Sequence, residues 1–205
     1  MKRVILLASL AFGVAACGHV AEVPDHSFFR MPAPAVLPVS AEQVFDIPIV
    51  VGLFAADGLY ADRALIHAVD AEARELRQYH YQLWTDPPTR MLQRRLLVEL
   101  REAAIAPMVI DQLAASQDAL RISGVILRFE RVPRPGGGWL AAVALKLRAD
   151  RADGTPFIDE VYRADVVADG AHLVATTDAL ATAVDAVFAE FHADLIAHPE
   201  AGRAR

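Results

Sequence analysis

The first seventeen residues constrain this chain more than any other stretch. Lys2 and Arg3 precede an apolar run, residues 4–12, and small residues then lead to Cys17, the only cysteine of the 205-residue chain. A positive start, a short apolar run and small residues are the three parts of a secretory signal, and the run is too short to span a bilayer. We therefore expect an exported domain that has no internal disulfide and is held together by its own core.

The residues just before the cysteine indicate how the signal is processed. Val14, Ala15, Ala16 and Cys17 resemble a bacterial lipobox, in which a lipoprotein signal peptidase cuts before a cysteine that carries lipid. Acylation would account for a lone thiol in an exported protein. We expect residues 1–16 to be a signal peptide and Cys17 to be lipidated, with palmitate among its acyl chains. The alternative is an ordinary signal whose cysteine is incidental.

Residues 17–26 are predicted to be a short lipidated tether. More than one acyl chain gives stable membrane anchoring. Gly18 stands where some lipoproteins carry Asp, and by resemblance to lipoprotein sorting in didermal bacteria it favours the outer membrane. Residues 18–26 reach at most about 30 Å when extended. The folded domain would therefore stay close to its membrane and face the periplasm.

Size and charge limit what the mature chain can be. Removal of residues 1–16 leaves 189 residues, enough for one domain, which we expect over residues 27–198 with a frayed tail at 199–205. The removed part contains Lys2 and Arg3 and no acid, so the formal net charge changes from −6 to −8. An acidic chain lacks the basic surface that nucleic-acid binding requires.

Alternating apolar and polar residues predict a sheet of about six or seven strands. The predicted strands cover residues 27–31, 45–53, 64–69, 76–84, 120–132, 139–148 and 156–167, and residues 108–110 are a further short candidate. Gly124 suggests a β-bulge within its strand, and Gly136, Gly137 and Gly138 form a flexible hairpin tip. Because successive strands are joined by short turns, we expect a largely antiparallel sheet.

Two stretches have the periodicity of amphipathic helices. The first begins at Thr85, Asp86, Pro87 and Pro88, where Thr or Asp can cap and Pro suits the first turn. Its leucines share one side, while its charged residues, Arg95 and Glu99 among them, are expected mostly outside. The second runs over about residues 173–197. The predicted fold class is α+β, with two main amphipathic helices packed on one face of the sheet.

No arrangement of residues in the sequence indicates catalysis or a cofactor. The seven histidines are scattered without an HExxH or HxxxH spacing, and no serine lies in a GxSxG motif. The glycines at 136–138 precede a strand rather than a helix, so they do not form a phosphate-binding loop. We therefore expect no enzyme activity, no metal and no cofactor.

Several segments stand in a characteristic order along the chain. They are Tyr60-Ala61-Asp62-Arg63, residues 79–88 with their aromatic strand, Trp84 and Pro-Pro, residues 92–100, Leu127-Arg128-Phe129-Glu130, and the hairpin and final helix after Trp139. Together they resemble the ABC-type transport auxiliary lipoprotein family, which is similar to the PqiC-type lipoproteins and includes components of MCE lipid-transport systems. The resemblance covers about residues 27–195. At Tyr60-Ala61-Asp62-Arg63 many relatives instead carry a Leu-Asp-x-Pro-like run.

The resemblance implies a non-catalytic lipoprotein that serves an ABC transporter whose ATPase, permease and MCE subunits are other polypeptides. The expected function is an outer-membrane component of an MCE-type system that moves lipids, acting alone or as a homo-oligomer. Two alternatives stay open, namely a structural or accessory envelope lipoprotein and a monomeric periplasmic lipid carrier with a cavity between sheet and helices. The residues that suggest a partner interface are Trp84, Asp86, Pro87, Gly136, Gly137 and Gly138.

Overall fold

The computed structural model describes residues 24–56 and 58–203. The predicted signal peptide, Cys17 and most of the predicted tether lie outside these residues. The strands are β1 (Ser27–Phe29), β2 (Ile49–Val51), β3 (Ala55–Ala56), β4 (Ala64–Ala68), β5 (Leu76–Trp84), β6 (Val109–Ile110), β7 (Leu120–Pro133), β8 (Trp139–Asp150) and β9 (Pro156–Val167). The helices are η1 (Gly58–Ala61), α2 (Pro88–Glu102), α3 (Leu173–Ile196) and η2 (Pro199–Gly202).

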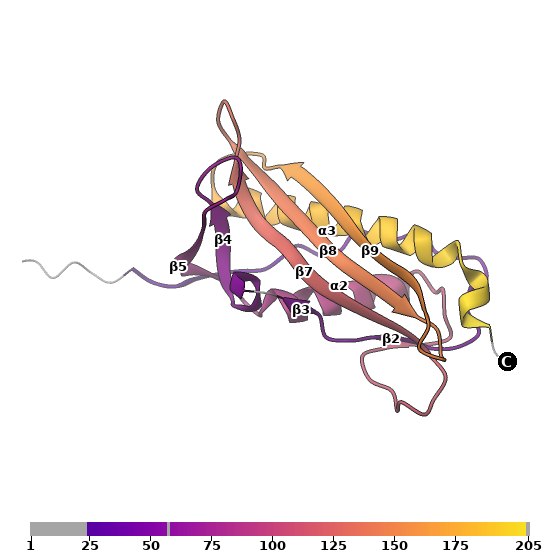
Figure 1. Ribbon diagram of the computed structural model, residues 1–205. Coiled ribbons are helices and arrows are strands. Elements are labelled where there is room, and N and C mark those ends of the chain that lie inside the picture. Colours follow the sequence, from indigo (N-terminus) through magenta and orange to yellow (C-terminus); the bar gives the residue numbers. More distant parts are fainter. Residues whose placement is uncertain (1–23, 57, 204–205) are drawn as a thin grey trace, which may run out of the picture.

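All nine described strands belong to one curled sheet in which β7 is central (Figure 1). One edge of β7 pairs with β8 along its whole length, and β8 pairs with β9, both antiparallel. The other edge pairs in succession with β2, β3 and β4, and these three pairings are parallel. The α+β class is confirmed, but the prediction of a largely antiparallel sheet is wrong because the sheet is mixed.

The parallel pairings arise because β2, β3 and β4 follow one another along the same edge of β7 and run in its direction, meeting it at Leu120, Val125 and Arg131 in turn. β5 reverses the chain beside β4, and α2 with the residues after it brings the chain back to the start of that edge before β7 begins. A short turn reverses the chain, whereas parallel strands need a longer connection. Short turns join β7 to β8 and β8 to β9, so the antiparallel expectation holds for that half of the sheet.

Both helices lie behind the strands in the view of Figure 1, with α3 running along β8 and β9. Val143, Leu145 and Leu147 of β8 point into this core, and the alternate residues Lys146 and Arg148 face solvent on the other side. The space between sheet and helices is filled by large side chains. The fully buried aromatic residues are Trp84, Phe45, Phe129, Phe188 and Phe191. No helix in the described part of the chain is long and apolar enough to cross a membrane.

The bulge expected at Gly124 is wrong. Gly124 pairs regularly with Leu147, and the register of the β7–β8 ladder shifts between Ile126 and Arg128. Gly124 has a different reason to be glycine, because an added Cβ would lie 2.6–2.8 Å from the ring of Phe54. The missing side chain lets Phe54 pack directly on the strand.

The N-terminal and C-terminal segments meet at one side of the core. The strand expected over residues 45–53 is shorter than predicted, since only Ile49–Val51 form β2. Phe45 is fully buried and packs against Gly202, whose carbonyl accepts a hydrogen bond from Asp46 N at 2.9 Å. The expectation of a frayed tail is therefore wrong for Pro199–Gly202, which form η2.

Candidate interaction surface

The segment that follows β1 lies against α2 and leaves a shallow groove beside it. β1 pairs in parallel with the end of β5, so the chain enters the groove at Arg30, just where α2 begins. The groove has a volume of about 410 Å³, and Met31, Met91 and Val98 supply its apolar part. Val98 is 38% exposed. This surface combines apolar side chains with the arginines of α2.

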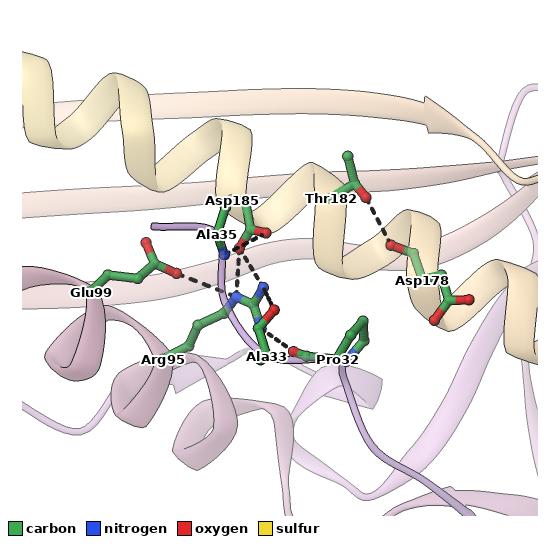
Figure 2. A network of polar contacts seen from close by, with 8 residues as sticks. All are labelled: Pro32, Ala33, Ala35, Arg95, Glu99, Asp178, Thr182 and Asp185. Carbon is green, nitrogen blue, oxygen red and sulfur yellow. Dashed lines mark hydrogen bonds and ion pairs between the residues drawn. The ribbon is translucent and has the colours of Figure 1, made fainter. Parts of the chain in front are cut away.

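A buried polar network lies beneath the groove and joins three parts of the chain (Figure 2). Arg95 of α2 donates to a carboxylate oxygen of Asp185 of α3 at 2.6 Å and to the carbonyl oxygen of Pro32 at 2.7 Å. A longer bond, at 3.3 Å, reaches the carbonyl oxygen of Ala33, and Asp185 accepts from the backbone N–H of Ala35 at 3.2 Å. One guanidinium group therefore holds the N-terminal segment to both helices.

Glu99 completes this network one turn further along α2. Its carboxylate lies 3.3 Å from Arg95 Nε, and its side chain is only 1% exposed. Burial, together with the nearby negative charge of Asp185, raises the pKa of Glu99 to about 8, although Arg95 acts in the opposite direction. Glu99 therefore keeps its proton at neutral pH, and one positive charge on Arg95 is balanced by one negative charge on Asp185.

The burial of Arg95 and Glu99 corrects the expectation that they lie outside the helix. They follow Leu92 by three and seven positions, so they share the stripe that carries Leu96 and Leu100. That spacing was the sequence signal from which the burial of Arg95 and Glu99 could have been predicted. The side of α2 that carries them is buried because the N-terminal segment and α3 both cover it, and no local pattern reveals that.

Trp84 lies in the core rather than on the surface. Its side chain is 1% exposed, and its ring packs on Phe129 of β7 with ring centroids 5.4 Å apart. The backbone N–H of Trp84 donates to the carbonyl oxygen of Arg63 at 2.6 Å, and Arg63 Nε donates to the carbonyl oxygen of Trp84 at 3.1 Å. The ring itself therefore offers no contact to a partner in this structure.

Asp86 and Pro87 stand beside the groove at the start of α2. Pro87 occupies the N-cap position and no side chain caps the helix there, so the expected capping role of Thr85 or Asp86 is wrong. The Asp86 carboxylate instead pairs with Arg94 at 3.1 Å on the surface. Asp86 thus lines the groove, and Pro87 is its neighbour in the chain.

The three glycines lie elsewhere, at the tip of the β7–β8 hairpin. Their φ angles are 86°, 102° and 84°, and an added Cβ would meet nothing within 4 Å at any of them. The tip is closed by hydrogen bonds between Arg134 and the glycines, from Arg134 N to Gly138 O and from Gly137 N to Arg134 O. These positions are therefore glycine because of their positive φ angles, which glycine adopts without strain, and not because a neighbouring group leaves no room for a side chain.

Segments that carry the family resemblance meet around Trp84. Tyr60 of η1 donates its hydroxyl proton to the buried carboxylate of Glu130, which also accepts from Arg128 Nε at 2.9 Å. Burial, the hydrogen bond and the charge of Glu130 raise the pKa of Tyr60. Tyr60 and Arg63 thus fix η1 against β7 and the end of β5. The segment Tyr60-Ala61-Asp62-Arg63 has a structural role here.

The described residues contain no cluster of three or more His, Cys, Asp or Glu side chains that could hold a metal ion. The polar groups that are brought together, Arg95 with Asp185 and Tyr60 with Glu130, are tied to one another or to the backbone. Their arrangement stabilises the junction between strands and helices.

Comparison with known proteins identifies the relationship. A family model described as the ABC-type transport auxiliary lipoprotein component matches residues 59–194. The chain belongs to this family. The resemblance inferred from the sequence is confirmed, and the family is one of auxiliary transport components rather than a class of enzymes.

Solved structures support the fold of this auxiliary lipoprotein. The crystal structure of protein XCC0632 from Xanthomonas campestris has a TM-score of 0.71 and 16% identity, covering 85% of this chain and 98% of that one. A second crystal structure, of an uncharacterized protein, has a TM-score of 0.62 and 13% identity, covering 85% and 99%. At such identities the likeness shows the fold alone. No curated protein matches the chain by sequence.

Proposed function

We propose that the chain is a non-catalytic lipoprotein of the outer membrane, anchored through Cys17, that serves an MCE-type ABC system moving lipids across the envelope. The observation that carries this proposal is the match of residues 59–194 to the auxiliary lipoprotein family. The lipobox-like Val14-Ala15-Ala16-Cys17 and the following Gly18 support the anchor and its membrane. The transporter would supply its ATPase, permease and MCE subunit as separate chains.

The filled core favours this function over a carrier that holds a lipid between sheet and helices. The described residues in that space include five fully buried aromatic side chains. An acyl chain would have to displace packed groups, and this costs free energy because protein interiors are already dense. A role through surface contacts with partner chains requires no such cavity.

For those contacts we propose two surfaces, both taken from the residues that the sequence singled out. One is the start of α2 with Asp86 and Pro87, supported from below by the buried Trp84. The other is the hairpin tip at Gly136, Gly137 and Gly138. Exposed, flexible tips and groove rims are common contact sites because they adapt at little cost. Copies of this chain are one partner to be tested, and transporter subunits are the other.

Photo-crosslinking tests the proposed partners directly. A photoreactive amino acid at position 137, or at position 86, should give covalent products with transporter subunits or with a second copy in intact cells. Position 152 is the matched control, because it lies in the exposed turn between β8 and β9. Mass spectrometry of the products names the partner. Equal yields of product at positions 137 and 152, or products that contain neither a transporter subunit nor a second copy of the chain, would contradict the proposal.

A further inference from the structure

An exposed aromatic patch lies next to the point where the predicted tether joins the domain. It consists of His26, Phe28, Arg63 and Tyr81, and we keep the name aromatic patch for these four residues. Phe28 of β1 is 55% exposed although its backbone is paired with Leu83 of β5. Ser27 and Phe29, the residues before and after Phe28, also pair with β5, so the backbone holds the Phe28 ring in its outward position.

The four side chains contact one another. The guanidinium carbon of Arg63 lies 5.3 Å from the centre of the Phe28 ring. His26 stacks on Phe28 with centroids 6.4 Å apart and meets the edge of Tyr81 at 5.5 Å. The patch therefore combines an apolar ring with amphipathic groups around it, which is the side-chain chemistry found where proteins meet the lipid headgroup region.

We propose that the aromatic patch rests on the phospholipid headgroups of the membrane that carries the anchor. The inference builds on the proposed lipidation of Cys17. Six residues lie between Cys17 and Pro24, the first described residue, so the two are at most about 25 Å apart along an extended chain. A tether this short keeps the patch at a high effective concentration near the bilayer, so a contact too weak for a free protein is populated.

Contact through the aromatic patch is apolar rather than ionic. Asp25 and Asp62, both exposed, adjoin the patch and offset Arg63 and Arg30. With the formal charge of the mature chain at −8, attraction to anionic lipid is not what brings this surface to the membrane. The contact should therefore persist at high salt, where ionic contacts are screened.

This orientation also fixes which end of the domain points away. The strands β1, β5 and β4 lie at the end of β7 that carries Arg131, while β2 pairs at its beginning, at Leu120. Figure 1 shows the N-terminal segment leaving at one end of the sheet, with the connection between β6 and β7 at the other. With the patch on the lipid, that connection faces the periplasm.

The lone cysteine makes the test simple. In the lipidated protein Cys17 carries no free thiol, so an introduced cysteine is the only site for a fluorophore. We would label full-length lipidated protein at Asp62→Cys, beside the patch, or at Ser116→Cys, in the distant connection, and reconstitute it in nanodiscs with nitroxide-headgroup lipids. Quenching is expected at position 62 and not at position 116, in low and in high salt.

Variants link the quenching to the patch itself. Phe28→Ala combined with Tyr81→Ala should remove at least about half of the quenching at position 62, and Phe28→Trp should retain it. Val174→Ala is the matched control, because Val174 is 56% exposed and lies on α3. Thermal melting of each variant shows that the fold is intact.

Two outcomes overturn the proposal, namely equal quenching at positions 62 and 116, or quenching at position 62 that the double variant leaves unchanged. Loss of the protein from the nanodisc altogether is a different result. It would contradict lipid anchoring, and the mass of the N-terminal peptide with or without acyl chains separates that failure from failure of the patch.

Discussion

At the scale of single residues, the network of Figure 2 places two carboxyl groups, those of Asp185 and Glu99, against the single guanidinium group of Arg95. Arg95 and Asp185 balance one another, and Glu99 fits beside them only as the neutral acid. A buried charge without a partner is costly, and the group responds by changing its pKa. The network is therefore sensitive to pH through Glu99.

Stability should fall as the pH rises from about 4.5 to about 8. Below 4.5, the ordinary pKa, Glu99 is protonated in both states, but above it only the folded state keeps the proton, until about pH 8. The difference corresponds to at most roughly 4–5 kcal/mol. Glu99→Gln should remove this part of the pH dependence in urea unfolding series, whereas Glu72→Gln, at an exposed site, should leave it unchanged. If the free energy of unfolding depended on pH in the same way in both variants, the role assigned to Glu99 would be contradicted.

A second residue-scale prediction concerns the space beside Phe54. Gly124→Ala puts a methyl group within 2.6–2.8 Å of a ring that is 2% exposed and packs on Phe188, so the ring must move. We expect a loss of about 1–3 kcal/mol in the free energy of unfolding. Gly52→Ala is the control, since its new Cβ would have an ordinary contact at 3.4 Å. Similar losses in both variants would count against the packing argument.

At the scale of elements, the segment of Pro32–Ala35 is held to α2 and α3 by side-chain contacts from Arg95 and Asp185 rather than by a strand ladder. It leads directly from β1, which is paired with β5. The network is therefore the second attachment of the N-terminal part of the chain, after the β1–β5 pairing.

Arg95→Ala should release the segment. It leaves the partly buried Asp185, whose side chain is 19% exposed, without its cation, which costs about 1–3 kcal/mol, and residues 32–35 lose the hydrogen bonds from Arg95. Limited proteolysis should cut there earlier, and urea unfolding should begin at lower concentration. Arg94→Ala is the neighbouring control, because its exposed pair with Asp86 contributes at most about 1 kcal/mol. Equal protection from protease in Arg95→Ala and the unaltered protein would contradict this role.

The sequence predicted elements that are formed by local contacts and missed those that depend on distant ones. β7, β8 and β9 are long stretches of strand-like sequence joined by short turns that contain glycine. Their positions and their pairing could therefore be predicted from neighbouring residues alone. The pairing of β2, β3 and β4 with β7 could not, because nothing near Ile49 identifies Leu120 as its neighbour. The helix start at Pro87 and the glycine hairpin tip lie where the sequence predicted them, whereas the burial of Arg95 and Glu99 depended on α3.

At the scale of the whole molecule, anchoring and folding are separate properties. The described core runs from Leu37 to Ala201 and includes no residue of the predicted tether. The fold should therefore be indifferent to whether Cys17 is acylated.

Cys17→Ser tests this separation. Without the thiol no thioether-linked lipid can form and the lipoprotein peptidase should not cut, so the protein should leave the outer-membrane fraction while its thermal melting stays the same. Membrane fractionation and the mass of the N-terminal peptide measure the first effect, and circular dichroism measures the second. A variant that fractionates with the outer membrane as before would contradict the proposed anchor.

The single long edge of β7 has a consequence for how the chain folds. β2, β3 and β4 all precede β7 in the sequence, and each uses that edge for a pairing. As the chain appears from its N-terminus, β4 can pair only with β5, β2 only with the two residues of β6, and β3 has no partner strand until residues 120–133 are available. Non-local parallel pairing of this kind slows folding and leaves strand edges exposed to aggregation in the meantime. The edge strands in the earlier part of the chain therefore stay open to aggregation until β7 has been made.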